Sequence, residues 1–178
     1  MSRFADYEQY DGLGLADLVR RREVTPRELL EAAIECVEAR NTAVNAVVMK
    51  LYDDGRKAIA EGLADGPFRG VPFLMKDLTS PVAGVPMTRG SKFFADTPPA
   101  SADSEHVKRL KRAGLVIFGR TNTPEIGLSL TCEPQLYGPT RNPWDVARIS
   151  GGSSGGAAAA VAARMLPMAH ASDRKSVV

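Results

Sequence analysis

The sequence has little cysteine and histidine, and it has no long apolar run. Cys36 and Cys132 are the two cysteines of the 178-residue chain and lie far apart, which excludes a disulfide framework and a cysteine-based zinc site. No stretch approaches the ~20 apolar residues that a membrane-spanning helix needs. The segment 1–10 mixes charged with aromatic residues, unlike a signal peptide. We therefore expect a cytoplasmic protein that makes no membrane contact.

A strong charge of either sign is also missing. Lys and Arg total 23 against 21 Asp and Glu, a net charge of +2, whereas a nucleic-acid-binding domain carries a basic stripe. The basic stretch 108–112 is too short for such a stripe and is expected to be the solvated face of a helix. His106 and His170, expected on a helix surface and beside a strand, lack further ligands at metal-binding spacing. The sequence thus predicts no metal, no cofactor and no nucleic-acid partner.

What the sequence does contain is an alternation of helical and strand patterns. Thr25-Pro26-Arg27-Glu28 has the form of a capping box with proline at the first helical position, so a helix should begin there. At 44% hydrophobic and 25% charged, the composition is that of a globular chain with a real core. The alternation predicts an α/β fold. The predicted helices are about 15–22, 26–40, 53–64 and 104–114, the strands 43–48, 70–75 and 115–119, with a long loop at 79–99.

A run of glycine and serine, 150–156, precedes an alanine-rich segment, 157–163. The glycines permit backbone conformations closed to other residues, and the small side chains permit close helix packing. One interpretation is a tight loop that enters a buried helix. Another is a phosphate cradle at a helix N-terminus, although neither a Gly-Lys-Ser/Thr ending nor a G-x-G-x-x-G pattern is present.

A third interpretation comes from the order of several separated motifs. Lys76 follows the apolar run 70–75, and the segments 121–125, 140–144 and 150–156 come after it. From about residue 10 to 173 this order is similar to that of the amidase signature family, whose members hydrolyse or transfer carboxamides. The details resemble the branch that acts on nylon-oligomer cyclic dimers. The resemblance implies the N-terminal part of an α/β/α fold around a mixed central sheet.

The resemblance also implies catalytic roles. Family members use a Ser-cisSer-Lys triad, in which Lys76 would be the general base and Ser153 the proton bridge, with a cis peptide bond before it. A lysine has a pKa near ~10.4 in water and must be neutral to act as a base, which burial favours. Ser154 is a secondary candidate that supports the loop, and Ser129 is a secondary candidate near the acyl pocket.

The chain departs from the family at its C-terminal end. The nucleophilic serine is expected at position 177, in a Gly-Gly-Ser turn, but the sequence has Val177 there. We expect 1–173 to be the N-terminal portion of an amidase domain and 174–178 a non-native tail. Residues 173–178 can be back-translated into GAT CGG AAG AGC GTC GTG, which resembles a short-read sequencing adapter. The chain as printed is expected to be inactive.

The expected activity of the parent protein is hydrolysis of a linear or cyclic carboxamide through an acyl-enzyme, on a small-molecule substrate. A homodimer is expected for the full-length protein. Two alternatives remain: the amidase subunit of a tRNA-dependent amidotransferase, which would have a nucleic-acid partner, and a non-catalytic remnant.

Two further residues have expected structural roles. Cys132 is expected to be a buried, inert thiol, and Trp144 is expected to anchor its turn by packing.

Overall fold

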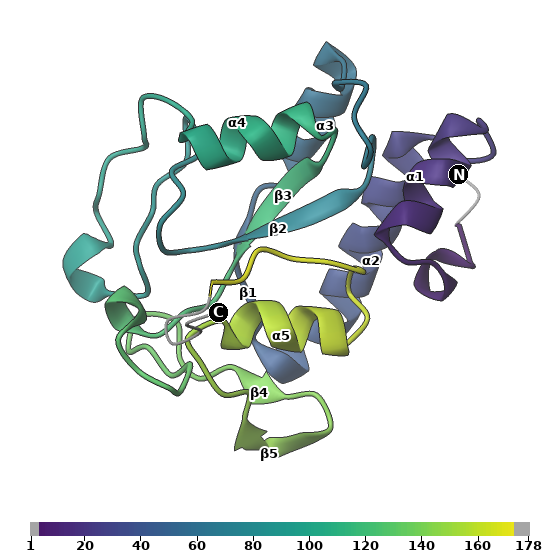
Figure 1. The fold of residues 1–178 in the computed structure, drawn as a ribbon. Coiled ribbons are helices and arrows are strands. Elements are labelled where there is room, and N and C mark those ends of the chain that lie inside the picture. The colour runs from purple at the N-terminus through teal and green to yellow at the C-terminus, as the bar shows by residue number, and fades with distance from the viewer. Residues whose placement is uncertain (1–3, 173–178) are drawn as a thin grey trace, which may run out of the picture.

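The computed structural model describes residues 4–172 and has an α/β architecture with a mixed sheet (Figure 1). Strands β1 (Val47–Lys50), β2 (Pro72–Lys76) and β3 (Val116–Thr121) form the sheet in the order β1-β3-β2. β2 runs parallel to β3, and β1 runs antiparallel to it. The fold class therefore agrees with the sequence prediction.

Five α-helices surround or flank this sheet in the described part of the chain. Of these, α2, α3 and α5 make the main helix contacts with the strands. Their bounds are α1 Gly12–Arg20, α2 Pro26–Val44, α3 Tyr52–Glu61, α4 Glu105–Arg112 and α5 Gly155–Ala162. Three 3₁₀ turns occur at Tyr7–Gln9, Lys92–Phe94 and Glu125–Gly127, and a small hairpin is formed by β4 (Arg141–Asn142) and β5 (Asp145–Ile149).

The predicted starts of two helices are confirmed. The Thr25 side chain accepts from the Glu28 N–H, and the Glu28 carboxylate accepts from the Thr25 N–H, so both bonds of the capping box are present. Ser104 caps α4 in the same way by accepting from the Val107 N–H. On α4, the basic side chains are exposed, as predicted for the stretch 108–112. They share this surface with acidic partners, including Glu105.

The predicted strand 43–48 is wrong in its first half. Helix α2 continues to Val44 and ends at Asn45, which has left-handed backbone dihedrals (φ 51°). The Asn41 side chain then accepts from the N–H groups of Ala46 and Val47 and donates to the Val47 carbonyl. Because this one amide satisfies the backbone of the turn, the apolar residues before Asn45 remain helical and the strand begins only at Val47.

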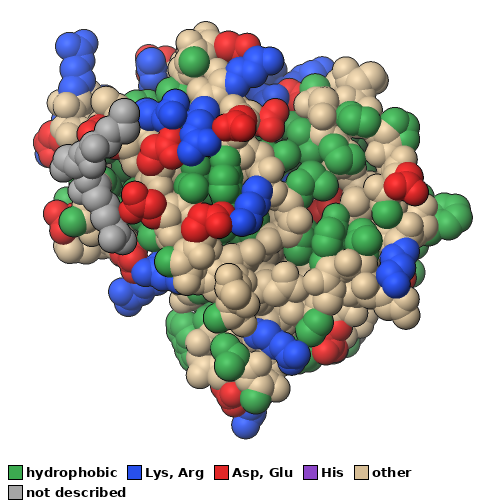
Figure 2. Space-filling view, turned by 180° about the vertical axis from the view of Figure 1, so that it is seen from behind, with side chains coloured by type: hydrophobic (Ala, Val, Ile, Leu, Met, Phe, Trp, Pro, Cys, Tyr) green, Lys and Arg blue, Asp and Glu red, His purple; other side chains and the backbone are tan. Residues whose placement is uncertain are grey.

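The core lies between the sheet and the helices that cover it. Every residue of β2 and β3 is buried, which is typical of strands covered on both faces. On the face shown in Figure 2, Lys and Arg side chains are interspersed with Asp and Glu.

Among the helices described in residues 4–172, none has the length and apolar character needed to cross a bilayer.

Candidate active site

Lys76 is the last residue of β2 and is completely buried. The apolar residues that precede it make the strand part of the core, so the strand carries the lysine side chain out of contact with water. Burial lowers the pKa of Lys76, and the nearby Cys132 acts weakly in the opposite direction. Within residues 4–172, Lys76 forms no ion pair with a carboxylate. Its surroundings therefore favour the neutral amine.

Three serine hydroxyls surround the Lys76 amine. Its Nζ lies 2.7 Å from Ser153 Oγ, 3.1 Å from Ser154 Oγ and 2.9 Å from Ser172 Oγ. These serines come from two segments, the glycine-serine loop and the stretch that follows α5. The structure thus brings together Lys76, Ser153 and Ser154, which the sequence analysis singled out, and adds Ser172.

The glycine-serine loop is held against the sheet by its backbone. The peptide bond between Gly152 and Ser153 is cis, as the resemblance implies. The Ser153 carbonyl accepts from Thr123 Oγ1 at 3.3 Å. Directly after the loop, a Cβ at Gly156 would lie 2.4 Å from the Asn122 nitrogen, so only glycine fits where α5 begins. The close approach of α5 to the end of β3 places Ser153 beside Lys76.

Ser154 joins the two segments. Its hydroxyl accepts from the Ser172 N–H and donates to the Ser172 carbonyl, both at 3.0 Å. With the hydrogen bond that it accepts from Lys76 Nζ, the Ser154 hydroxyl has used its one proton and both of its lone pairs. It therefore holds Ser172 beside the amine.

Ser172 is a site residue that the sequence reasoning missed. It follows the stretch 169–170, which pairs in parallel with β2 through a bridge between Leu74 and Ala169. Figure 1 shows the segment after α5, in yellow, running back along β2. Parallel strands present their carboxyl ends at the same edge of a sheet. The sequence signal for Ser172 was its position just after a short strand-like stretch. This position corresponds to that of Lys76 at the end of β2.

Ser129 lies elsewhere. It is exposed, and its hydroxyl bonds to Thr131 Oγ1 at 3.1 Å and accepts from the Thr131 N–H. These bonds organise the loop 125–131, and Ser129 makes no contact with Lys76 in the described structure. The secondary role of Ser129 near the acyl pocket stays a prediction.

The expected packing of Trp144 is wrong, since 78% of this residue is exposed. The turn is held instead by the Asn142 side chain, which accepts from the Trp144 N–H at 3.0 Å. A side-chain-to-backbone bond of this type closes a turn without any packing of the indole. Cys132 is fully buried as expected, and burial raises the pKa of its thiol.

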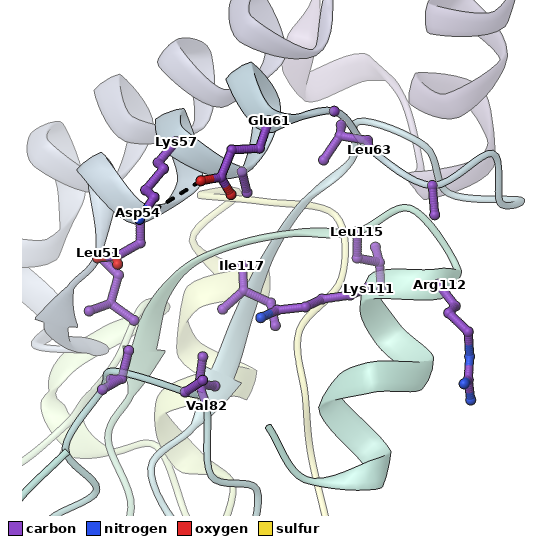
Figure 3. A pocket seen from close by; sticks show the side chains of 15 residues that line it. Leu51, Asp54, Lys57, Glu61, Leu63, Val82, Lys111, Arg112, Leu115 and Ile117 are labelled. Carbon is purple, nitrogen blue, oxygen red and sulfur yellow. Dashed lines mark ion pairs between the residues drawn. The ribbon is translucent and has the colours of Figure 1, made fainter. Parts of the chain in front are cut away.

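A separate cavity of about 580 Å³ lies between α3, the end of α4 and the start of β3 (Figure 3). Apolar side chains such as Leu51, Leu115 and Ile117 line it, and an ion pair between Lys57 and Glu61 lies at its rim. None of the residues around the Lys76 amine lines this cavity. The predicted nucleophile position 177 and the predicted tail 174–178 lie outside the described residues.

The site thus joins a buried lysine to a cis-linked serine of a glycine-serine loop at the end of a mixed α/β sheet. Residues 28–174 match the model of the amidase family, and the chain belongs to this family.

Three relatives illustrate the similarity. The chain is 46% identical over 164 residues to the 6-aminohexanoate-cyclic-dimer hydrolase of Paenarthrobacter ureafaciens, covering 92% of the chain and 33% of the relative. A glutamyl-tRNA(Gln) amidotransferase subunit of Salinispora tropica is 38% identical, with 94% and 35% covered. A solved structure of 6-aminohexanoate cyclic dimer hydrolase complexed with substrate is 44% identical, with a TM-score of 0.88 and 94% and 34% covered. The chain spans about a third of the length of these relatives.

Proposed function

We propose that this chain carries the general base and the proton bridge of an amidase that hydrolyses a carboxamide C–N bond through an acyl-enzyme. The 2.7 Å contact between Lys76 Nζ and Ser153 Oγ, inside a buried site, carries the proposal. Lys76 is the base, Ser153 relays the proton, and Ser154 and Ser172 hold the amine in place. Membership of the amidase family supports the reaction class.

The hydrogen bonds around Lys76 suit a neutral amine. A neutral amine has two N–H groups and one lone pair. Ser154 already donates its hydroxyl proton to the Ser172 carbonyl, so Ser154 accepts from Nζ. With the second N–H directed to Ser172, the lone pair faces Ser153, the nearest hydroxyl. The Ser153 hydroxyl can then donate to Nζ and leave its own oxygen free to accept another proton.

This arrangement accounts for every proton in the reaction. A nucleophilic hydroxyl passes its proton to Ser153 Oγ while the Ser153 proton passes to Lys76 Nζ, and the nucleophile oxygen bonds to the carbonyl carbon. When the C–N bond breaks, the proton returns through Ser153 to the leaving amine. Water then attacks the carbonyl carbon of the acyl-enzyme while its proton passes through Ser153 to Lys76. When the bond to the nucleophile oxygen breaks and the acid is released, that proton returns through Ser153 to the nucleophile. The nucleophile is expected at position 177, where the printed chain has Val177, so we expect that chain to be inactive.

The substrate class we propose is a linear or cyclic small-molecule amide. The relative at 46% identity is named for hydrolysis of the 6-aminohexanoate cyclic dimer, whereas the amidotransferase subunit is 38% identical. The higher identity favours a free-standing hydrolase over an amidotransferase subunit. Release of the linear dimer from the cyclic dimer, and of ammonia from glutamine, distinguishes the two activities.

The test starts from the gene. Sequencing past codon 173 establishes which residue stands at position 177, and the protein encoded by that reading frame is then assayed on both substrates. Lys76→Ala and Ser153→Ala should each lower amide hydrolysis by about 10³-fold or more, as loss of general-base catalysis does. Lys108→Ala, which removes an exposed lysine on α4, is the matched control and should retain the activity.

The outcomes separate the alternatives. A serine at position 177 with hydrolysis that depends on Lys76 supports the proposal. Full hydrolysis by Lys76→Ala overturns the assignment of the base. A true Val177 in a protein that binds but does not hydrolyse amides would identify a non-catalytic remnant.

A further inference from the structure

The backbone pairing along β2 changes character at Lys76. The parallel bridge between Leu74 and Ala169 is followed by a bond from the His170 N–H to the Leu74 carbonyl at 2.9 Å. In a parallel ladder, the next bond would join the Lys76 N–H to the carbonyl of residue 170. The Lys76 N–H donates instead to His170 Nδ1, at 3.3 Å. An imidazole has therefore replaced the carbonyl of a continued strand.

Because the imidazole takes the place of the residue 170 carbonyl, the chain can leave the sheet at His170 instead of continuing the parallel ladder. The Lys76 N–H keeps a partner inside a buried site, where an unpaired N–H would be costly. The backbone after His170 is thereby free to turn toward the Lys76 side chain. Two residues further on, Ser172 Oγ reaches Nζ at 2.9 Å, and Ser154 secures it through two backbone bonds.

The geometry points to His170 as a positioning residue, which ends the parallel ladder at Lys76 and directs Ser172 onto the amine. Among the described residues, the His170 side chain forms no hydrogen bond to Lys76 Nζ or to Ser153; it acts through the Lys76 backbone and through Ser172. The inference rests on the proposed function only in taking Lys76 as the base.

The surroundings of His170 keep its imidazole in the form that this role needs. Nδ1 can accept a hydrogen bond only from the neutral ring with its proton on Nε2. Burial and three neighbouring basic groups, His106 on α4, Lys76 on β2 and Arg120 on β3, lower the pKa of His170 to about 4. The ring of His106 packs edge-on against that of His170 with 4.8 Å between centroids, and His106 Nδ1 bonds to Ser80 Oγ. His170 is thus neutral at physiological pH.

The experiment measures amide hydrogen exchange at Lys76 in the 178-residue chain, relative to exchange at Asn122. The Asn122 N–H bonds to the Ala46 carbonyl on a different part of the sheet, so global destabilisation raises both rates together. His170→Ala should raise the Lys76 rate relative to Asn122 by about tenfold, as loss of one buried hydrogen bond does. His170→Asn should restore most of the protection, because the Asn oxygen can take the place of Nδ1.

A second readout follows the Lys76 side chain. With Ser172 released in His170→Ala, reductive methylation of the Lys76 amine should become faster, and His170→Asn should slow it again. His106→Ala is the matched control: it removes the neighbouring exposed imidazole and should leave Lys76 exchange within about twofold of the parent, since His106 makes no bond to the Lys76 backbone.

Equal protection of Lys76 in the parent and His170→Ala, or an Asn variant no better than the Ala variant, would overturn the positioning role. Neither readout uses turnover. A failure of the amidase proposal would therefore leave these results unchanged, and the two proposals can fail separately.

Discussion

Gly156 lies so close to the backbone of Asn122 that a Cβ at position 156 would stand 2.4 Å from the Asn122 nitrogen and 2.5 Å from its oxygen. The contact joins the first turn of α5 to the residue that follows β3. The Asn122 backbone is itself fixed, because its N–H bonds to the Ala46 carbonyl. The glycines after the serines therefore serve helix packing, and this packing sets where Ser153 lies.

We expect Gly156→Ala to destabilise the fold by about 1–3 kcal/mol, the range for overpacking, despite the better helix propensity of alanine. The clash is with backbone, which cannot move aside as a flexible side chain would. Urea unfolding measures the change. Ala158→Ser, at an exposed position of the same helix, is the control and should change stability by less than about 0.5 kcal/mol. Unchanged or increased stability of Gly156→Ala would contradict the close contact.

The buried Lys76 should give the fold a recognisable pH dependence. Its pKa is lowered in the folded state, whereas an unfolded lysine has a pKa near ~10.4. Between those two values the unfolded state binds more protons, so stability rises with pH, by up to about 1.4 kcal/mol per pH unit. Above the unfolded pKa the effect is complete.

The measurement is the difference in unfolding free energy between the parent and Lys76→Met, taken by urea titration from pH 7 to pH 10. The parent should gain stability relative to the variant as the pH rises. Lys108→Met removes an exposed lysine and should show a flat difference. A difference that falls with rising pH would mean that the fold favours the charged amine.

Local patterns predicted much of this structure. The capping box at Thr25 and Glu28 is a short-range signal, and both of its bonds are present. The apolar run 70–75 indicated a buried strand, and the strand does lead to a buried Lys76. In each case the deciding interactions lie within a few residues of one another, where sequence patterns are informative.

The errors came from interactions that sequence patterns do not encode. Ser172 reaches Lys76 because the stretch 169–170, distant in sequence from β2, pairs in parallel with it through a single bridge. The end of α2 is set by Asn45 in a left-handed conformation and by one Asn41 side chain, which apolar periodicity does not register. Trp144 was expected to pack because aromatic residues usually do, but burial depends on neighbours that the hairpin does not supply.

A buried ion pair supports the strand ends beneath the site. Asp77 and Arg120 are both fully buried with 3.8 Å between Oδ1 and Nη1, and Asp77 Oδ2 accepts from Thr88 Oγ1 at 2.6 Å. Arg120 also donates to the Lys76 and Ser80 carbonyls at 3.4 Å. Asp77→Asn should cost about 3–5 kcal/mol, because the guanidinium loses its only compensating buried charge among the described residues.

Thermal and urea unfolding test this prediction against Asp145→Asn. That change breaks the exposed pair with Arg148 and should cost less than about 1 kcal/mol. The double variant Asp77→Asn/Arg120→Met removes both charges and should recover part of the loss. A cost for Asp77→Asn no greater than that for Asp145→Asn would show that the buried pair contributes little.

The exposure of Trp144 can be tested directly, because it is the single tryptophan of the chain. With 78% of the residue exposed, its fluorescence should have the long-wavelength maximum of a hydrated indole and should be quenched by acrylamide nearly as well as a free tryptophan derivative.

Trp144→Ala should change stability by less than about 0.5 kcal/mol. Phe118→Ala, which truncates a fully buried aromatic residue of β3, should cost about 3–5 kcal/mol. A blue-shifted, poorly quenched indole would show that another surface covers Trp144 in solution. Dilution would then distinguish the two sources of such a contact, because dilution weakens an intermolecular contact and leaves an intramolecular one unchanged.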